Sequence, residues 1–365
     1  MFIHQHSSWP AFTWDSHALL PRIGRVRQLQ GQLSGQLRSL GFVLRQEAFL
    51  DTMTLDVLKT SEIESVFLEP EQVRSSVARR LGMHIAGLVP SDRDVDGVVD
   101  MMLDATRNYD QPLTAQRLFD WHAALFPTGR SGMNPIRVGQ WRNDEKGPMQ
   151  VVSGAIGKEQ VHFQAPDAAR LEADMQLFVA WFNEHQEIDP VLKAGIAHLW
   201  FITIHPFDDG NGRMARAITD MQLSKSEKQS VRFYSMSAQI RLQRKGYYAI
   251  LEKTQRGGLD ITEWLTWFLD QFEQALLAAG IALEGVLKKA VFWEKHAGLV
   301  LNARQSLMLQ KLLDYFDGKL TTAKWAKITK CSADTALRDI QDLMAKGILQ
   351  KDLSAGRSTS YLLVP

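Results

Sequence analysis

The sequence predicts a mainly α-helical protein with one small β-hairpin and a separate C-terminal domain. Apolar residues recur at spacings of three and four over residues 19–37, which predicts an amphipathic helix, and a nearly continuous apolar run over residues 194–204 predicts a buried helix. Two short extended runs, residues 151–153 and 160–163, flank a glycine-containing stretch and predict the hairpin. The 365 residues are enough for two or three domains with a buried core.

The composition is that of an ordinary globular protein, with 45% hydrophobic and 23% charged residues. A net charge of +1 argues against a globally basic nucleic-acid-binding protein, although it leaves room for a local basic patch. The single cysteine, Cys331, excludes an internal disulfide framework and fits a reducing compartment. The chain starts without the pattern of a signal peptide and has no apolar run long enough to span a membrane. We therefore expect a cytoplasmic protein without membrane contact.

The sequence pattern of residues 1–92 predicts a helical N-terminal extension. An aromatic start leads into the helix over residues 19–37, and a second helical stretch follows over residues 42–58. The next segment, residues 60–65, reads Thr-Ser-Glu-Ile-Glu-Ser. A further helix over residues 73–81 is rich in arginine, which we interpret as a solvated helical face rather than a nucleic-acid site.

The sequence pattern of residues 93–300 predicts a central helical domain. Amphipathic patterns predict helices over residues 94–108, 113–126, 167–185 and 241–255, and Asp260 and Glu263 form a capping pair for a long aromatic-rich helix. The apolar run of residues 194–204 follows Asp189 and Pro190, a favoured helix start. Pro206 should end that helix and leave His205 at its exit.

The stretch from residue 205 to residue 216, His-Pro-Phe-Asp-Asp-Gly-Asn-Gly-Arg-Met-Ala-Arg, is the chemically richest part of the chain. Gly210, Asn211 and Gly212 allow a turn whose amide hydrogens point into one concavity at the start of a helix, which favours an anion. Arg213 and Arg216 are three residues apart, so both guanidinium groups can share a helical face and bind phosphate oxygens.

Two further side chains supply the remaining chemistry of this stretch. Asp209 offers oxygen ligands that suit Mg²⁺, which commonly binds through one or two carboxylates and the phosphates of a substrate. His205 is the only neighbouring side chain that can take up a proton near neutral pH. A tight turn with a core histidine would explain each residue alone, but it does not require two arginines behind the turn.

Residues 205–216 resemble, without a mismatch, the Fic-family motif His-x-Phe-x-(Asp/Glu)-Gly-Asn-Gly-Arg-x-x-Arg. The resemblance implies transfer of AMP from ATP to a Ser, Thr or Tyr hydroxyl of a target protein, with release of pyrophosphate. It makes His205 the base and Asp209 the Mg²⁺ ligand, and it assigns the phosphates to the glycine turn and to both arginines. It also implies that the hairpin over residues 151–163 is a flap that aligns the target by strand addition; a structural loop is the alternative.

Residues 60–65 resemble the inhibitory motif of Fic proteins, (Ser/Thr)-x-x-x-Glu-(Gly/Asn), although Ser65 stands where Gly or Asn is usual. The resemblance implies that Glu64 pairs with Arg216 and that the N-terminal extension holds the enzyme inactive. A carboxylate on Arg216 would occupy the position of the ATP γ-phosphate, because both compete for the same donors. The alternative is that Glu64 is a solvated helix residue.

Tyr248, Leu251 and Gln255 fall at spacings of three and four and share one helical face. They resemble the adenine-side pattern Tyr-x-x-Leu-x-x-x-Asn of Fic proteins, with Gln255 in place of Asn. The resemblance implies that this face binds the adenine ring. A Tyr and a Leu at this spacing also suit a plain core, and that alternative stays open.

Residues 301–365 predict a winged helix-turn-helix domain. Helical patterns over residues 305–316, 322–327 and 333–346 are followed by two short strands, residues 348–353 and 360–364. Arg338, Lys346 and Arg357 could contact DNA phosphates, whereas Asp334, Asp339 and Asp342 on the third helix would repel them. DNA binding and a docking or dimerisation role are both left open.

The sequence therefore favours an autoinhibited, ATP-dependent protein adenylyltransferase whose cofactor is Mg²⁺ and whose partner is a protein with an acceptor hydroxyl. Two alternatives remain. The chain could be a DNA-binding regulator with a nucleotide-sensing core, or a Fic enzyme that removes AMP or transfers another nucleotide or a phosphate. Homodimer formation is also left open.

Overall fold

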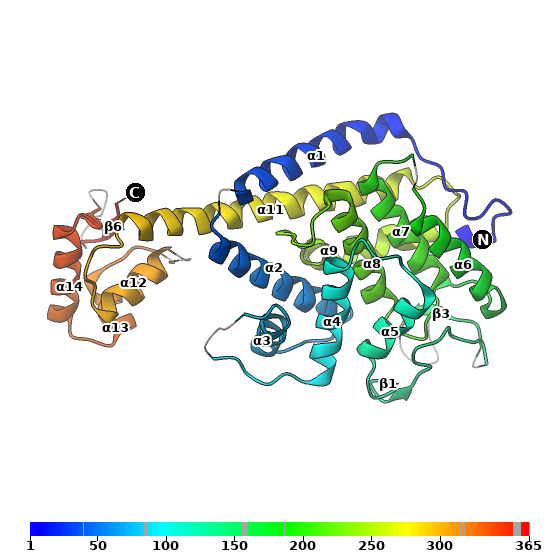
Figure 1. Cartoon of the computed structure of the whole chain (residues 1–365), viewed down its shortest axis with the longest axis horizontal. Helices are drawn as coiled ribbons and strands as arrows, with labels where there is room; N and C mark the ends of the chain where they lie inside the picture. The colour runs from blue at the N-terminus through cyan, green and yellow to red at the C-terminus, as the bar shows by residue number, and fades with distance from the viewer. Residues whose placement is uncertain are drawn as a thin grey trace. The chain divides into compact units, whose positions relative to one another are not determined.

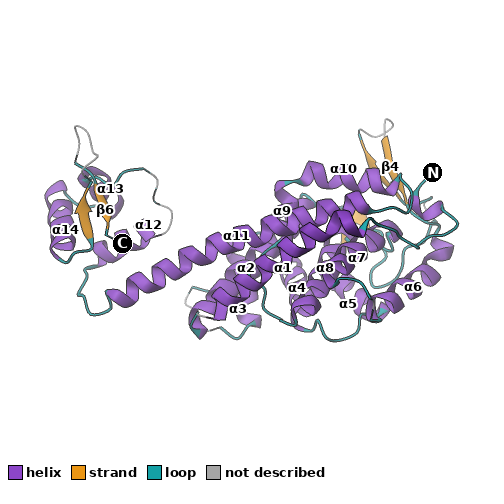
Figure 2. Ribbon diagram, turned by 90° about the horizontal axis from the view of Figure 1, so that it is seen from above, coloured by secondary structure: helices purple, strands orange, loops and turns teal. Residues whose placement is uncertain are grey.

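The computed structural model describes residues 1–38, 40–83, 87–145, 147–154, 160–185, 187–313, 316, 318–352 and 359–364. Contacts divide the chain into two compact units, residues 1–280 and 281–365. The division falls within one long helix, α11 (Thr262–Lys295). Figures 1 and 2 show that helices dominate the first unit and that its strands are few and short, as the sequence predicts.

Along the chain, the first unit has a group of helices, then a segment of short strands, and then a second group of helices. Its elements are α1 (Ser16–Arg38), α2 (Phe42–Ile63), α3 (Pro70–Arg80), α4 (Arg93–Arg107), α5 (Ala115–Leu125), β1 (Arg130–Ser131), β2 (Asn134–Pro135), β3 (Gln150–Ser153), β4 (Gln160–Gln164), α6 (Leu171–Asn183), α7 (Pro190–Ile204), α8 (Asn211–Glu227), α9 (Met236–Leu242), α10 (Arg244–Gln255) and the first part of α11. Helix α2 runs on to Ile63, five residues beyond the predicted stretch, and therefore carries the segment 60–65 at its end.

Helices α7 and α8 form the centre of the first unit. Asp189 caps α7 by accepting a hydrogen bond from the Val191 amide at 2.7 Å, and Pro190 occupies the first turn. Every residue of α7 after Pro190 is buried, which explains its continuous apolar run. On α11, the Trp264 indole donates to the Gly195 carbonyl at 2.8 Å, so the long helix is fixed against the central pair.

The N-terminal extension packs along this core. Helix α1 lies beside the first half of α11 (Figure 1), where Arg22 pairs with Asp270 at 2.8 Å. Helix α2 packs against α9 and α8. A buried ionic cluster joins these elements, because Arg232 lies 2.8 Å from Asp220 of α8 and 3.6 Å from Asp56 of α2. This cluster fixes the interior of α2 against the interior of α8.

The predicted hairpin is an antiparallel pair, β3 and β4, with a register shift between Val151 and Val152. Its base is anchored on both sides. The Arg256 guanidinium at the end of α10 donates to the carbonyls of Val161 and His162, at 2.6 and 3.0 Å. On the other side, the Phe2 ring packs edge-on against Phe163, with ring centroids 5.2 Å apart. The hairpin therefore leans on the main body, as an isolated two-stranded hairpin must.

The second unit has the predicted order of three helices and two strands. Helices α12 (Ala303–Leu313), α13 (Thr322–Thr329) and α14 (Ala333–Ala345) precede the antiparallel strands β5 (Leu349–Lys351) and β6 (Tyr361–Leu363). One apolar core joins all five elements to the end of α11, and its buried members are Phe292, Met308, Leu309, Leu320, Trp325, Ala336, Ile340, Leu343, Ile348, Leu349 and Tyr361. Arg357 lies outside the described residues.

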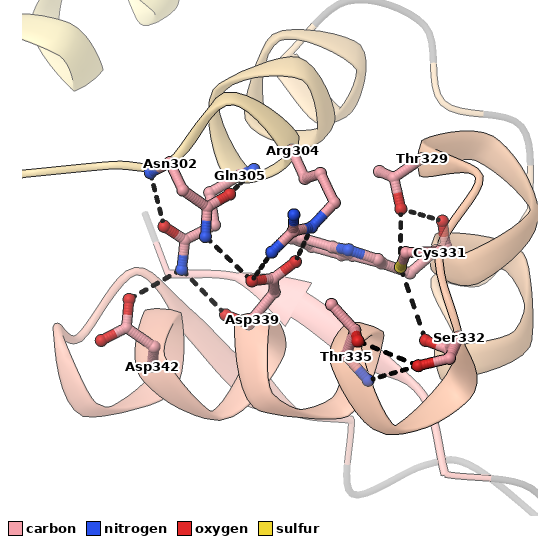
Figure 3. A network of polar contacts seen from close by, with 10 residues as sticks. Asn302, Arg304, Gln305, Thr329, Cys331, Ser332, Thr335, Asp339 and Asp342 are labelled. Atoms are coloured by element: carbon pink, nitrogen blue, oxygen red, sulfur yellow. Dashed lines mark hydrogen bonds and ion pairs between the residues drawn. The ribbon is translucent and has the colours of Figure 1, made fainter.

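Asp339 of α14 does not face solvent, which corrects the expectation that its carboxylate would repel DNA, whereas the side chain of Asp342 is 47% exposed. Asp339 is only 5% exposed and accepts two hydrogen bonds from Arg304, at 2.7 and 3.0 Å (Figure 3). Asp342 accepts from Gln305 at 2.7 Å and from Lys346. Both carboxylates are thus used to join α14 to the start of α12 and to its own last turn.

Among the helices of the described part of the chain, none combines the length and apolar character that a membrane crossing requires.

Gly97 on α4 allows the close approach of α5, because a Cβ at this position would overlap the Ala124 carbonyl oxygen. We predict that Gly97→Ala lowers the free energy of unfolding by about 2 kcal/mol, since backbone must move to relieve the overlap. Gly24→Ala on α1 is the matched control. Nothing lies within 4 Å of its Cβ position, so it should raise stability by about 0.5–1 kcal/mol. Urea unfolding measures both, and equal effects would contradict this packing.

Candidate functional site

His205 follows the last residue of α7 in a left-handed backbone conformation, with φ 52° and ψ 59°. Its amide donates to the Phe201 carbonyl at 3.0 Å, which closes the last turn of the helix. The buried Arg142 guanidinium donates to the His205 carbonyl at 2.8 Å. Because a non-glycine residue rarely adopts this conformation, these contacts are what hold the side chain at the helix exit.

The His205 ring has a defined protonation state. Its Nδ1 lies 3.2 Å from the Ile202 carbonyl oxygen, and a carbonyl can only accept, so Nδ1 carries the proton and Nε2 is left as an acceptor. Burial lowers the pKa of His205 to about 4. The imidazole is therefore neutral near pH 7, with a free lone pair on Nε2.

The loop after His205 is held in place by contacts of Phe207, Asn211 and His122. Phe207 is fully buried and stacks on His122, with ring centroids 4.2 Å apart. The Asn211 side chain bonds both the amide and the carbonyl of Phe207, at 3.0 and 2.8 Å. His122 donates from Nε2 to the Asp209 carbonyl and accepts from the Gly139 amide, both at 3.2 Å. Burial lowers the pKa of His122 to about 4, so it remains a neutral structural residue.

Two glycines of the loop are required by close contacts. Gly210 has φ +82°, and a Cβ there would come within 2.9 Å of the Phe126 ring. Gly212 lies directly under the Glu64 carboxylate, where a Cβ would overlap Oε1. Helix α8 begins at Asn211, two residues before the helical pattern in the sequence. The first amides of α8 therefore belong to the same turn as the two glycines.

The two arginines of α8 are both buried but have different partners. The Arg213 guanidinium lies over the Phe126 ring, 4.9 Å from its centroid. Arg216 is 2% exposed and donates to the Thr60 hydroxyl, the Thr60 carbonyl and Glu64 Oε1, at 2.7, 2.8 and 2.8 Å. Arg216 Nη1 has no hydrogen-bond partner among the described residues, and it lies 3.3 Å from the Cβ position of Gly212. One buried donor group is thus directed toward the glycine turn.

Glu64 ends α2 and projects into the site, with 30% of its side chain exposed. Besides Arg216, it accepts a hydrogen bond from the Tyr248 hydroxyl at 3.3 Å. The next residue, Ser65, has φ +62°, a conformation that favours Gly or Asn. The Arg244 guanidinium bonds the Ser65 hydroxyl at 3.0 Å, which helps to hold a serine in this conformation.

A cavity of about 720 Å³ brings most of the predicted residues together. His205, Asp209 and residues 210–212 line one side, and Glu64 projects from another. Tyr248, Leu251 and Gln255 of α10 form a further wall, and the hairpin strands β3 and β4 close the rim. Of the predicted site residues, only Arg213 and Arg216 do not line this cavity; both lie behind the glycine turn.

Asp209 lies at the edge of the cavity. Its Oδ1 accepts from the Gly210 amide at 2.5 Å, and its Oδ2 accepts from the Ser131 hydroxyl. Within the described ranges, no three His, Cys, Asp or Glu side chains gather closely enough to form a complete metal site. Asp209 by itself offers too few ligands for a metal site made by protein alone, and it suits an ion that also takes phosphate ligands.

Several residues that shape the site are not apparent in the sequence. Thr60 and Arg142 make direct contacts with Arg216 and His205, but each is an ordinary residue on a distant helix or loop. His198 lies beneath the cavity, where it joins the Thr219 and Tyr247 hydroxyls at 2.9 and 2.8 Å. Thr60 is the first residue of the stretch that resembles the inhibitory motif, but the motif does not indicate its contact with Arg216.

Comparisons with known proteins identify two regions of the chain. Residues 112–223 match the sequence profile of the Fic/DOC family, and residues 2–83 match a domain of unknown function, DUF4172. The "Protein adenylyltransferase Fic" of Drosophila mojavensis is 30% identical over 146 residues, which cover 40% of this chain and 25% of that protein. The protein of the same name from Drosophila grimshawi is 32% identical over 113 residues, which cover 30% and 22%. The chain thus spans about a quarter of the length of these relatives.

Solved structures share the fold. A Fic family protein from Desulfovibrio desulfuricans G20 superimposes with a TM-score of 0.54 at 20% identity, over 97% of this chain and 98% of that one. A Fic domain containing signaling protein from Bacteroides thetaiotaomicron VPI-5482 gives a TM-score of 0.51 at 17% identity, over 72% and 97%. This likeness shows a shared fold, and residues 112–223 match the sequence profile of the Fic/DOC family.

Proposed function

We propose that the protein transfers AMP from ATP to a hydroxyl group of a target protein and releases pyrophosphate. The observation that carries this proposal is the cavity in which a neutral histidine faces a glycine turn backed by two buried arginines. Such a turn suits phosphates, and the histidine suits activation of a hydroxyl. The Drosophila adenylyltransferases support the same activity, because this chain is 30% identical to one of them over 146 residues.

In the proposed reaction, His205 takes the proton of the acceptor hydroxyl on Nε2. The hydrogen bond from Nδ1 to the Ile202 carbonyl keeps the ring in the required tautomer. The Ile202 carbonyl also favours the imidazolium that forms, because that cation remains a donor at Nδ1. As the proton leaves, the hydroxyl oxygen attacks the α-phosphorus and pyrophosphate departs.

The phosphates would be held by the start of α8. The amides of Asn211 and Gly212 in the first turn of α8 would donate to them, favoured by the helix dipole, and the Gly210 amide would join them by leaving Asp209 Oδ1. Arg213, which lies behind the glycine turn, would add positive charge. Arg216 Nη1, which has no hydrogen-bond partner among the described residues, would donate to a phosphate oxygen. Asp209 would bind Mg²⁺ together with the phosphates, and the ion would neutralise charge on the leaving pyrophosphate.

We further propose that Glu64 inhibits the protein from the N-terminal extension. Its carboxylate lies on Arg216 and above Gly212, where an outer phosphate of ATP would otherwise bind. A phosphate and a carboxylate cannot occupy one guanidinium face together. ATP would then bind in a reactive position only after Glu64 leaves, so the extension, residues 1–92, acts as a built-in inhibitor of the domain that we place at residues 93–300.

The role of His205 predicts that His205→Ala lowers AMP labelling of lysate proteins by at least about a hundredfold, because a positioned base contributes that much or more. ATP binding should persist, since the phosphate-binding groups remain. The measurement uses α-labelled ATP with a cell lysate, alongside calorimetric titration with ATP. The exposed His185→Ala is the matched control and should label like the wild type. Undiminished labelling by His205→Ala would remove the assignment.

The role of Glu64 predicts that Glu64→Gly raises AMP labelling by roughly tenfold or more. A hydrogen bond to a charged group contributes about 1.5–3 kcal/mol, and 1.4 kcal/mol corresponds to a factor of ten. Labelling rates of purified variants at equal concentration provide the measurement. Glu62→Gly is the matched control, because Glu62 lies in the same helical turn but pairs with Lys59 and Arg241. Equal rates in the wild type and Glu64→Gly would exclude inhibition by this carboxylate.

DNA binding by the second unit is a second candidate function. Residues 281–365 contain 13 Lys and Arg against 8 Asp and Glu, whereas the whole chain has a net charge of only +1. In addition, Asp339 and Asp342 of α14 are engaged by Arg304, Gln305 and Lys346. The winged helix-turn-helix interpretation would place α14 in the major groove.

If this unit binds DNA, Arg338→Ala should weaken retention on duplex DNA and reduce the slope against salt by about one counterion. Arg338 is exposed on α14. Lys311→Ala on α12 serves as the control for a loss of charge elsewhere in the same unit. Absence of retention of the intact protein at low salt would rule out DNA binding and favour docking or dimerisation.

A further inference from the structure

A second hydroxyl–imidazole–carboxylate arrangement lies at the rim of the same cavity. The Ser153 hydroxyl is 2.6 Å from His162 Nε2, and His162 Nδ1 is 2.8 Å from Glu252 Oε2. The other oxygen of Glu252 pairs with Arg256 at 3.1 Å, so the carboxylate is held in place. All three residues of the arrangement line the cavity that contains His205.

The direction of the hydrogen bonds follows from the chemistry of the groups. A carboxylate only accepts, so His162 donates from Nδ1 to Glu252. In the neutral form of the ring, Nε2 accepts and the Ser153 hydroxyl is the donor. This order is the one that prepares a serine oxygen for nucleophilic attack, because the base is adjacent and is itself oriented by a third group.

The hairpin departs from regular pairing at this place. Val151 pairs with Phe163 and Val152 pairs with Val161, so His162 is the additional residue of β4. A bulge of this kind redirects a side chain and is common beside active sites. The two carbonyl contacts of Arg256 at residues 161 and 162 fix the bulged backbone against α10. The geometry of His162 thus has its own structural support.

We propose that Ser153 is an acceptor of AMP from the ATP bound in this cavity, with His162 as its own base. This inference rests on the proposed adenylyltransferase activity and names a modification site on the chain itself. The Ser153 oxygen forms a bond to the α-phosphorus, the bond from that phosphorus to the bridging oxygen of the β-phosphate breaks, and pyrophosphate leaves. The serine proton passes to His162 Nε2, and Glu252 stabilises the resulting imidazolium.

A separate base for Ser153 makes the two reactions distinguishable. In the Glu64→Gly background, His205→Ala should lose labelling of lysate proteins but retain AMP on Ser153. His162→Ala and Glu252→Gln should show the reverse, with AMP on Ser153 lowered at least tenfold relative to labelling of lysate proteins. Peptide mass spectrometry after incubation with ATP measures AMP at residue 153, and α-labelled ATP with a lysate measures the other reaction.

Substitutions at the acceptor complete the test. Ser153→Ala should abolish AMP at this position, whereas Ser153→Thr, which keeps the hydroxyl, should retain it. Ser7→Ala, at an exposed serine that does not line the cavity, is the control. Labelled lysate proteins with no AMP on Ser153 would overturn this inference while the proposed function stands. An absence of AMP from both lysate proteins and the chain would overturn the proposed function itself.

Discussion

The buried guanidinium of Arg216 is the feature on which the rest of the site depends. It is 2% exposed and carries a charge that must be matched inside the protein. Thr60 and Glu64, both from the end of α2, supply acceptors to this cation, yet Nη1 still lacks a hydrogen-bond partner among the described residues. One cation therefore joins the N-terminal extension to the glycine turn. We propose that the Glu64 carboxylate and an ATP phosphate compete for Arg216, so that only one of them can bind there at a time.

The surroundings of this pair keep the competing groups in a fixed geometry. The Glu64 carboxylate lies so close to Gly212 that a Cβ at this position would overlap it, so a glycine is required there. On the opposite side of the loop, the ring of His122 and the amide of Asn211 hold Phe207 and the carbonyl of Asp209. The left-handed conformation of His205 is held by Arg142 from outside α7. The loop is thus positioned before any ligand binds, which lowers the cost of ordering it around phosphates.

Much of this fold is predictable from sequence because its helices have strong apolar patterns and clear ends. Asp189, Pro190 and Pro206 delimit α7, and the order of three helices and two strands in the second unit follows from periodicity alone. The catalytic motif is readable because its residues are contiguous. Contacts between segments that are far apart in the sequence cannot be predicted in this way. Thr60 on Arg216, Arg142 on His205 and the Ser153–His162–Glu252 arrangement depend on packing angles that a single sequence does not encode locally. The engagement of Asp339 by Arg304 is not predictable for the same reason, since the face of a helix that becomes buried is set by its neighbours.

The most direct test compares nucleotide affinities, measured by calorimetry, of the wild type and Glu64→Gln, a variant that keeps the side-chain size but removes the charge. If Glu64 and an outer phosphate compete for Arg216, the variant should bind ATP about tenfold more tightly and bind AMP with unchanged affinity, because AMP has no outer phosphate. An equal gain for AMP, or no gain for ATP, would contradict competition at Arg216.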